Sequence, residues 1–79
     1  MLRELSLINN QIPSLPPEIG YLIALESLYL DDNDMTSLPK EIANLVNLVD
    51  LGISGNPFSS FPAEILSLSG LKRLDIGDC

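Results

Sequence analysis

Histidine is absent from the 79-residue sequence, and cysteine occurs once, at the C-terminus. Without histidine, neither a Ser-His nor a Cys-His arrangement for nucleophilic catalysis can form. The single Cys79 cannot close an internal disulfide, so nothing requires an oxidising compartment. No Asn-x-Ser/Thr glycosylation sequon occurs either. These absences favour a cytoplasmic location or, for the missing sequon, a bacterial source.

Basic residues are also scarce, because four Lys and Arg stand against eleven Asp and Glu, giving a net charge of −7. Nucleic acids and anionic membranes require a basic surface, so the charge excludes both as partners. No apolar run approaches the ~18 residues of a membrane span, and the opening MLRELSLINN lacks the apolar core of a signal peptide. Apolar residues nevertheless make up 46% of the chain, which excludes a disordered tail and predicts one small packed domain.

Motifs for catalysis, cofactors or metals are incomplete. The acidic run DDND at 31–34 lacks the glycine and the distal glutamate of an EF-hand loop, and predicts a solvated acidic surface. GISGNP at 52–57 has glycines but no phosphate-binding lysine, so it is not a P-loop. The sequence therefore predicts no enzyme activity and no catalytic, cofactor or metal site.

The most informative feature is a repeat of 23 residues without insertion or deletion. SLPPEIGYL at 14–22 returns as SLPKEIANL at 37–45 and as SFPAEILSL at 60–68. The repeat divides the chain into units 2–24, 25–47 and 48–70 with a partial unit 71–79. Three positions illustrate it, occupied by Pro16, Pro39 and Pro62, by Glu18, Glu41 and Glu64, and by Asn10, Asn33 and Asn56 with Cys79 in fourth place.

Each unit begins with apolar residues that alternate with polar or small ones, as in LRELSL and LESLYL, which predicts a short strand with one buried face. The asparagine that follows is expected to be buried and to hydrogen-bond the turn and the next unit through its side chain. The alternative is a surface turn asparagine in every unit.

The prolines predict where a helix begins in each unit. Proline lacks an N–H and holds φ near −65°, so we expect Pro16, Pro39 and Pro62 at the first helical position. The glutamates two residues later then meet the positive end of the helix, which predicts a structural and not a catalytic role. A single unit buries too little apolar surface to fold alone, so the units must stack on one another. The predicted fold is an α/β, right-handed coil of parallel strands.

The pattern LxxLxLxxNxIxxLPxEIxxLxxL resembles the leucine-rich repeat, and LPxEI resembles its 23-residue class. That class occurs in Ras-pathway scaffolds, plant intracellular Ras-group-related proteins, cell-polarity scaffolds and bacterial proteins. The resemblance covers residues 2–79 and implies a curved solenoid with strands on the concave face and short helices on the convex side. Cys79 departs from the motif asparagine.

The resemblance implies that partners bind the concave face. Acidic residues dominate its predicted columns, and one tyrosine stands among them, a residue type enriched at binding hot spots. The predicted partner-binding residues are Tyr29, Asp31, Asp32, Asp50 and Asp75. We expect a scaffold or adaptor that binds another protein, with a basic one fitting best. The alternatives are a regulatory or substrate-recognition segment of a kinase, GTPase or bacterial effector ligase, an inert spacer, and for Tyr29 a ring that only covers Gly52.

Neither end of the sequence shows the polar capping unit that solenoids normally carry. The chain is therefore expected to be a fragment of a longer array. Apolar side chains at both ends then lack a covering neighbour, which predicts concentration-dependent self-association or partial unfolding of the isolated chain.

Overall fold

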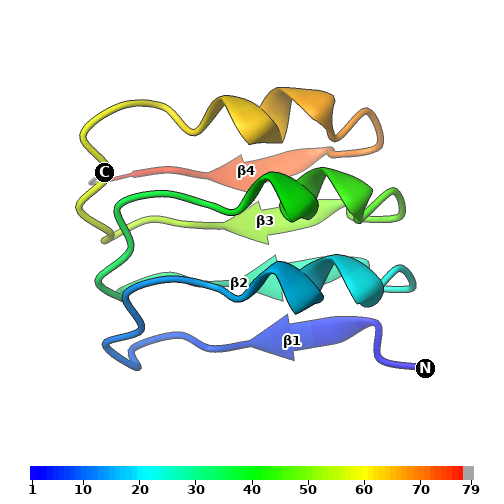
Figure 1. Ribbon diagram of the computed structural model, residues 1–79, viewed down its shortest axis with the longest axis horizontal. Coiled ribbons are helices and arrows are strands. Elements are labelled where there is room, and N and C mark those ends of the chain that lie inside the picture. The colour runs from blue at the N-terminus through cyan, green and yellow to red at the C-terminus, as the bar shows by residue number, and fades with distance from the viewer. Residues whose placement is uncertain (78–79) are drawn as a thin grey trace.

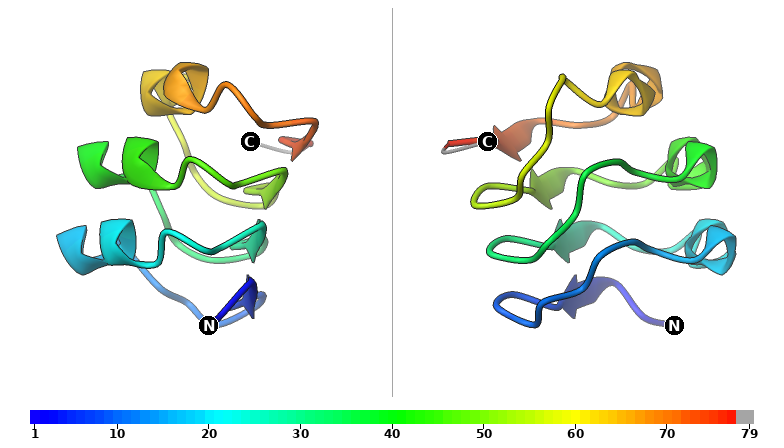
Figure 2. Two further views of the ribbon diagram at one scale, coloured as in Figure 1. Left: turned by 90° about the vertical axis from the view of Figure 1, so that its right-hand side faces the viewer. Right: turned by 60° about the vertical axis from the view of Figure 1, so that its left-hand side comes forward.

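Four short strands alternate with three 3-10 helices in the computed structural model, which describes residues 1–77. Cys79, predicted to take the fourth asparagine position, lies outside the described residues. The elements follow the chain as β1 (Glu4–Ser6), η1 (Pro17–Tyr21), β2 (Ser27–Tyr29), η2 (Lys40–Asn44), β3 (Asp50–Gly52), η3 (Ala63–Ser67) and β4 (Arg73–Asp75). The strands stack in chain order, and the helices stack beside them on the other side of the coil (Figures 1 and 2). The predicted α/β solenoid is confirmed.

All three strand pairs are parallel, and their register repeats the spacing of the sequence. Leu5, Leu28, Leu51 and Leu74 lie opposite one another in the four strands. Each unit also bonds the next beyond the strand ends, where the amides of Leu7 and Leu30 donate to the carbonyls of Tyr29 and Gly52 at 2.8 Å. A slip of one residue would turn every inward leucine toward solvent, so the apolar columns and the ladder specify the same register.

The core lies between the sheet and the helices and is most complete in the second unit. The side chains of Leu25, Leu28, Leu30, Met35, Ile42, Leu45, Leu48 and Ile53 are fully buried. Ile42 of η2 and Leu45, which directly follows that helix, both belong to this core. The first and third units each cover one side of this core. Such stacking is required because a single unit buries too little apolar surface to fold alone.

Asn33 confirms the predicted buried asparagine, although its cross-unit bonds go to the preceding unit and not to the next. Its Oδ1 accepts hydrogen bonds from the amides of Asn10 and Ile12, both at 3.0 Å. Its Nδ2 donates to the carbonyls of Leu7 at 2.9 Å and Leu30 at 2.8 Å. The direction follows from the fold, because the turn carrying Asn33 lies over the strand end of the first unit.

Asn56 repeats this arrangement one unit later. Its Oδ1 accepts from the amide of Met35 at 3.0 Å, and its Nδ2 donates to the carbonyls of Leu30 at 2.9 Å and Ile53 at 3.0 Å. Asn10, in the first unit, is exposed, and its side-chain Nδ2 donates to the carbonyl of Ile8 at 3.2 Å. The three asparagines therefore share a column but not an environment.

The prolines precede the helices instead of opening them, so the prediction of the first helical position was wrong. Pro16 is extended, with φ −73° and ψ 155°, and Pro17 takes the first helical position. A residue followed by proline is pushed out of the helical region, which accounts for Pro16. Its carbonyl accepts the first helical bond, from the amide of Ile19 at 3.1 Å. Glu18 does lie in the first turn, as expected.

Apolar side chains are uncovered at both ends of the coil. Leu2 and Ile76 are 47% and 41% exposed, and Leu5, Leu7, Leu71 and Leu74 are only partly buried. We call these six residues the end patches. No helix within residues 1–77 combines the length and the apolar character needed to cross a membrane.

Candidate binding surface

We call the side of the sheet that faces away from the helices the sheet face (Figure 2). Because side chains alternate along a strand, the central leucines point into the core and their neighbours point outward. The register aligns the outward residues in two columns, Glu4–Ser27–Asp50–Arg73 and Ser6–Tyr29–Gly52–Asp75. Asp31 and Asp32 follow β2 at one margin of this face.

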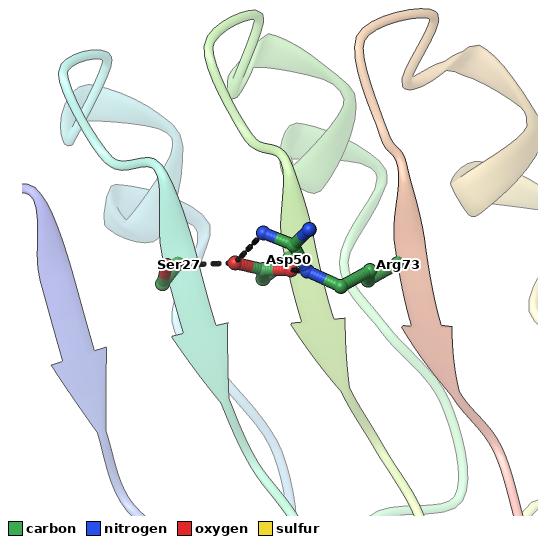
Figure 3. Close-up of polar contacts among 3 residues, drawn as sticks. All are labelled: Ser27, Asp50 and Arg73. Atoms are coloured by element: carbon green, nitrogen blue, oxygen red, sulfur yellow. Dashed lines mark hydrogen bonds and ion pairs between the residues drawn. The ribbon is translucent and has the colours of Figure 1, made fainter.

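Asp50, in the first column, is held by residues of both neighbouring strands (Figure 3). The Nε of Arg73 donates to Oδ1 of Asp50, and its Nη2 donates to Oδ2 at 2.9 Å. The hydroxyl of Ser27 also donates to Oδ2, at 3.3 Å. The Asp50 side chain is 16% exposed and that of Arg73 71%, so the guanidinium lies on the solvent side of the pair.

The Asp50–Arg73 contact changes the titration of both groups. Hydrogen bonds from Arg73 lower the pKa of Asp50 below its ordinary value of 3.8, and partial burial opposes this only in part. The same bonds raise the pKa of Arg73, with a smaller contribution from Tyr29. Asp50 therefore stays ionised under physiological conditions, with its charge compensated inside the chain.

Tyr29 is half-buried in the second column, between two small neighbours. Ser6 and Gly52 lie opposite it in β1 and β3. The group closest to the outward side of Gly52 is the carboxylate of Asp31, because a β-carbon added there would lie 2.9 Å from Asp31 Oδ2. The interpretation that the tyrosine ring alone covers Gly52 is therefore incomplete.

Asp31 has a structural role that sequence reasoning missed. Its Oδ2 accepts hydrogen bonds from the amide of Ser54 at 3.2 Å and from the hydroxyl of Ser54 at 2.6 Å. The second and third units are thereby joined just beyond the strands. A carboxylate that accepts two hydrogen bonds is less available to a partner than a free one.

Asp32 also has a backbone reason for its identity. It adopts φ 59°, and the aligned residues Asn9 and Gly55 adopt φ 62° and 70°. Asparagine, aspartate and glycine are the residues that tolerate this left-handed region best. Their presence at one repeat position was the signal for a tight turn in every unit. The Asp32 side chain itself remains exposed.

The exposed acidic residues of the sheet face are Glu4, Asp32 and Asp75. Within residues 1–77, the ion pair of Asp50 with Arg73 is the only one between side chains. Asp75 accepts a hydrogen bond from the amide of Gly77 at 3.2 Å, which leaves its charge in place. The structure thus separates the predicted acidic residues into two with internal partners, Asp31 and Asp50, and two that face solvent.

A hollow is formed by the loop after β2 and by the loop after β3 together with the start of η3. It is an open hollow of about 280 Å³ between segments 36–38 and 58–64. Phe58 and Phe61 line it together with three hydroxyl side chains and the carboxylate of Glu64. Across residues 1–77, no three acidic or cysteine side chains converge as metal ligands, in this hollow or elsewhere.

Comparison with known proteins places these features in a wider group. The model of the leucine rich repeat family matches residues 1–58. The solved structure of a leucine-rich repeat protein from Leptospira interrogans is similar, with 46% sequence identity over 92% of this chain and a TM-score of 0.86. The match covers 19% of that protein, so the present chain spans only a small part of its length. No curated protein matches the chain.

Proposed function

Because the chain belongs to the leucine-rich repeat family, we propose that it is a protein–protein interaction module that binds its partner on the sheet face. Leucine-rich repeat domains generally mediate protein–protein interaction and are typically non-catalytic. The observation that carries the proposal is Tyr29, half-buried between the small residues Ser6 and Gly52 on a face that also carries the exposed acidic residues Glu4, Asp32 and Asp75. We further assign the chain to the 23-residue LPxEI class and to a scaffold or adaptor role in the cytoplasm.

Rigid display is the proposed mechanism. Parallel strands hold neighbouring outward side chains about 4.8 Å apart. The cross-unit bonds of Asn33 and Asp31 keep the units from sliding or rotating. A partner therefore meets a surface that is already ordered, so little entropy is lost on this side of the interface when the complex forms.

A basic partner fits this surface best. Glu4, Asp32 and Asp75 carry charge that no side chain on the sheet face neutralises. Complementary charge mainly accelerates association and weakens with added salt. Tyr29 would supply the desolvated contact that charge alone does not provide.

The alternative function is a regulatory or substrate-recognition segment of a larger enzyme. The match covers 19% of the Leptospira protein, so the present chain corresponds to a small part of a longer protein there. A catalytic domain beside the array in the parent protein would favour this alternative. Its absence there would favour the scaffold.

Titration with a basic peptide tests the proposed binding face. We would use a fluorescent 12-residue peptide of alternating Arg and Gly, with a Glu-Gly peptide as the negative control. Tyr29→Ala should weaken binding by about tenfold, as expected for a hot spot, and Asp75→Lys should weaken it further at low salt. Lys40→Glu, on η2, should leave affinity unchanged or slightly raised.

Each variant must first give the circular dichroism spectrum of the parent protein. We choose Asp75 and not Asp31 for the charge reversal, because Asp31→Lys would also remove the hydrogen bonds to Ser54. If Lys40→Glu weakened binding while Tyr29→Ala did not, the partner would bind the helix side and the proposal would be wrong.

A further inference from the structure

Arg73 is the one basic residue in the outward columns of the sheet face, and its guanidinium is committed to Asp50. Both carboxylate oxygens of Asp50 are engaged, one by Nε and the other by Nη2 of Arg73. Ser27 contacts the same carboxylate from the opposite strand (Figure 3). The chain thus already contains one arginine bound at an acidic position of the surface proposed for a basic partner.

We propose that Arg73 occupies an arginine-binding position at Asp50 and thereby determines how strongly the sheet face selects arginine-bearing partners. This inference rests on the proposed function. A partner arginine can reach Asp50 only by displacing Arg73, and the exchange replaces one set of hydrogen bonds by an equivalent set. In the protein as it exists, the position therefore contributes little to affinity.

The geometry of the position selects guanidinium over ammonium. A planar guanidinium donates two parallel hydrogen bonds to one carboxylate, whereas a lysine ammonium acts as a compact point charge. The bond from Ser27 to Oδ2 restrains the carboxylate in the orientation that receives this fork. Once Arg73 is removed, the freed Asp50 should prefer an arginine side chain of an extended partner segment to a lysine.

Lys72 provides a matched control for the charge of Arg73. The two residues are adjacent and exposed, and their amides both donate to the carbonyl of Val49. The side chain of Lys72 has no ion-pair partner among residues 1–77. Removing either side chain changes the net charge equally, but only Arg73→Ala releases Asp50.

The experiment compares Arg73→Ala and Lys72→Ala in titrations with the 12-residue Arg-Gly peptide and a Lys-Gly peptide of equal length. Both variants should bind both peptides slightly more tightly than the wild type, because removing a basic side chain makes the protein more negative. Arg73→Ala should gain a further factor of about two to five with the Arg-Gly peptide alone, the range of an exposed ion pair. Adding Asp50→Asn to Arg73→Ala should remove that further gain.

Equal gains from Arg73→Ala and Lys72→Ala, or an equal gain for both peptides, would overturn the inference. Arg73→Gln, which keeps the aliphatic stem, replaces Arg73→Ala if the latter loses its folded spectrum. The change in peptide affinity that Tyr29→Ala causes in the otherwise wild-type protein tests the proposed function separately. An Asp50-dependent gain without a Tyr29 effect would retain the arginine position and reject Tyr29 as the hot spot of the proposed function. Absence of peptide binding by both the wild type and Arg73→Ala would reject both.

Discussion

Replacing Asn33 by alanine removes a buried side chain that joins the first unit to the second. Asn33 is 4% exposed, and five hydrogen bonds connect its amide group to main-chain atoms. Two of the acceptors keep another donor, because the carbonyl of Leu30 is also bonded by Asn56 and that of Asp31 by the amide of Asn9. The loss therefore falls on three groups of the first unit.

Those three groups are the amides of Asn10 and Ile12 and the carbonyl of Leu7. A buried polar group without a partner costs about 1–3 kcal/mol. Asn10 is exposed, so water can replace the lost bond at its amide, whereas Ile12 and Leu7 are partly buried. We therefore expect Asn33→Ala to reduce the free energy of unfolding by about 2–3 kcal/mol.

Urea unfolding followed by far-ultraviolet circular dichroism measures this loss. With a dependence of about 1–1.5 kcal/mol per molar urea, the midpoint should fall by about 2 M. Asn10→Ala is the matched control, since it makes the same change at the same repeat position where the side chain is exposed. It should cost less than about 0.5 kcal/mol, and Asn44→Ala and Asn47→Ala less than about 1 kcal/mol. Equal midpoints for Asn33→Ala and Asn10→Ala would refute the reasoning.

Four further outcomes are expected. Because Arg73 lowers the folded-state pKa of Asp50, the stability that ionised Asp50 contributes should be complete above pH 3.8 and lost as pH falls through the lower folded value. The stability difference between wild type and Asp50→Asn should therefore vanish in acid, and a constant difference would contradict this. Asp32→Ala should lower the free energy of unfolding by about 1 kcal/mol, because Asp32 has a φ of 59°, whereas Asp32→Gly should not lower it. Equal urea midpoints for these two variants would argue against backbone strain. Gly20→Ala should cost about 1–3 kcal/mol in the same assay, because the added β-carbon would lie 2.9 Å from the carbonyl oxygen of Glu41. The end patches should cause concentration-dependent association in sedimentation velocity, and a folded monomer at high concentration would count against it.

The repeat predicted the architecture well because one register satisfies every column at once. The alignment of Leu5, Leu28, Leu51 and Leu74 followed directly from their spacing, and the structure confirms it. The buried environment of Asn33 and Asn56 followed as well, since a polar side chain at fixed spacing within an apolar pattern requires internal partners. The exposure of Asn10 did not follow from the repeat, because its sequence position is the same and only its neighbours differ.

Local geometry at the helix ends was predicted less well. Pro16, Pro39 and Pro62 were assigned the first helical position, but each precedes its helix in an extended conformation. Both positions suit a residue with φ near −65°, so φ cannot distinguish them. The value of ψ decides, and ψ depends on how the chain crosses from the loop to the helix side of the coil.

The sequence by itself determined the repeat length and the inward and outward positions of the strands, and it predicted an acidic sheet face. These properties depend on residue type and spacing alone. Only the tertiary structure decided which charges remain available. Asp31 and Asp50 look equivalent to Asp32 and Asp75 in the sequence, yet they are held by Ser54 and by Arg73 from the adjacent unit. Hydrogen bonds extend only about 3 Å, so a partner 23 residues away is established only when the units are stacked in space.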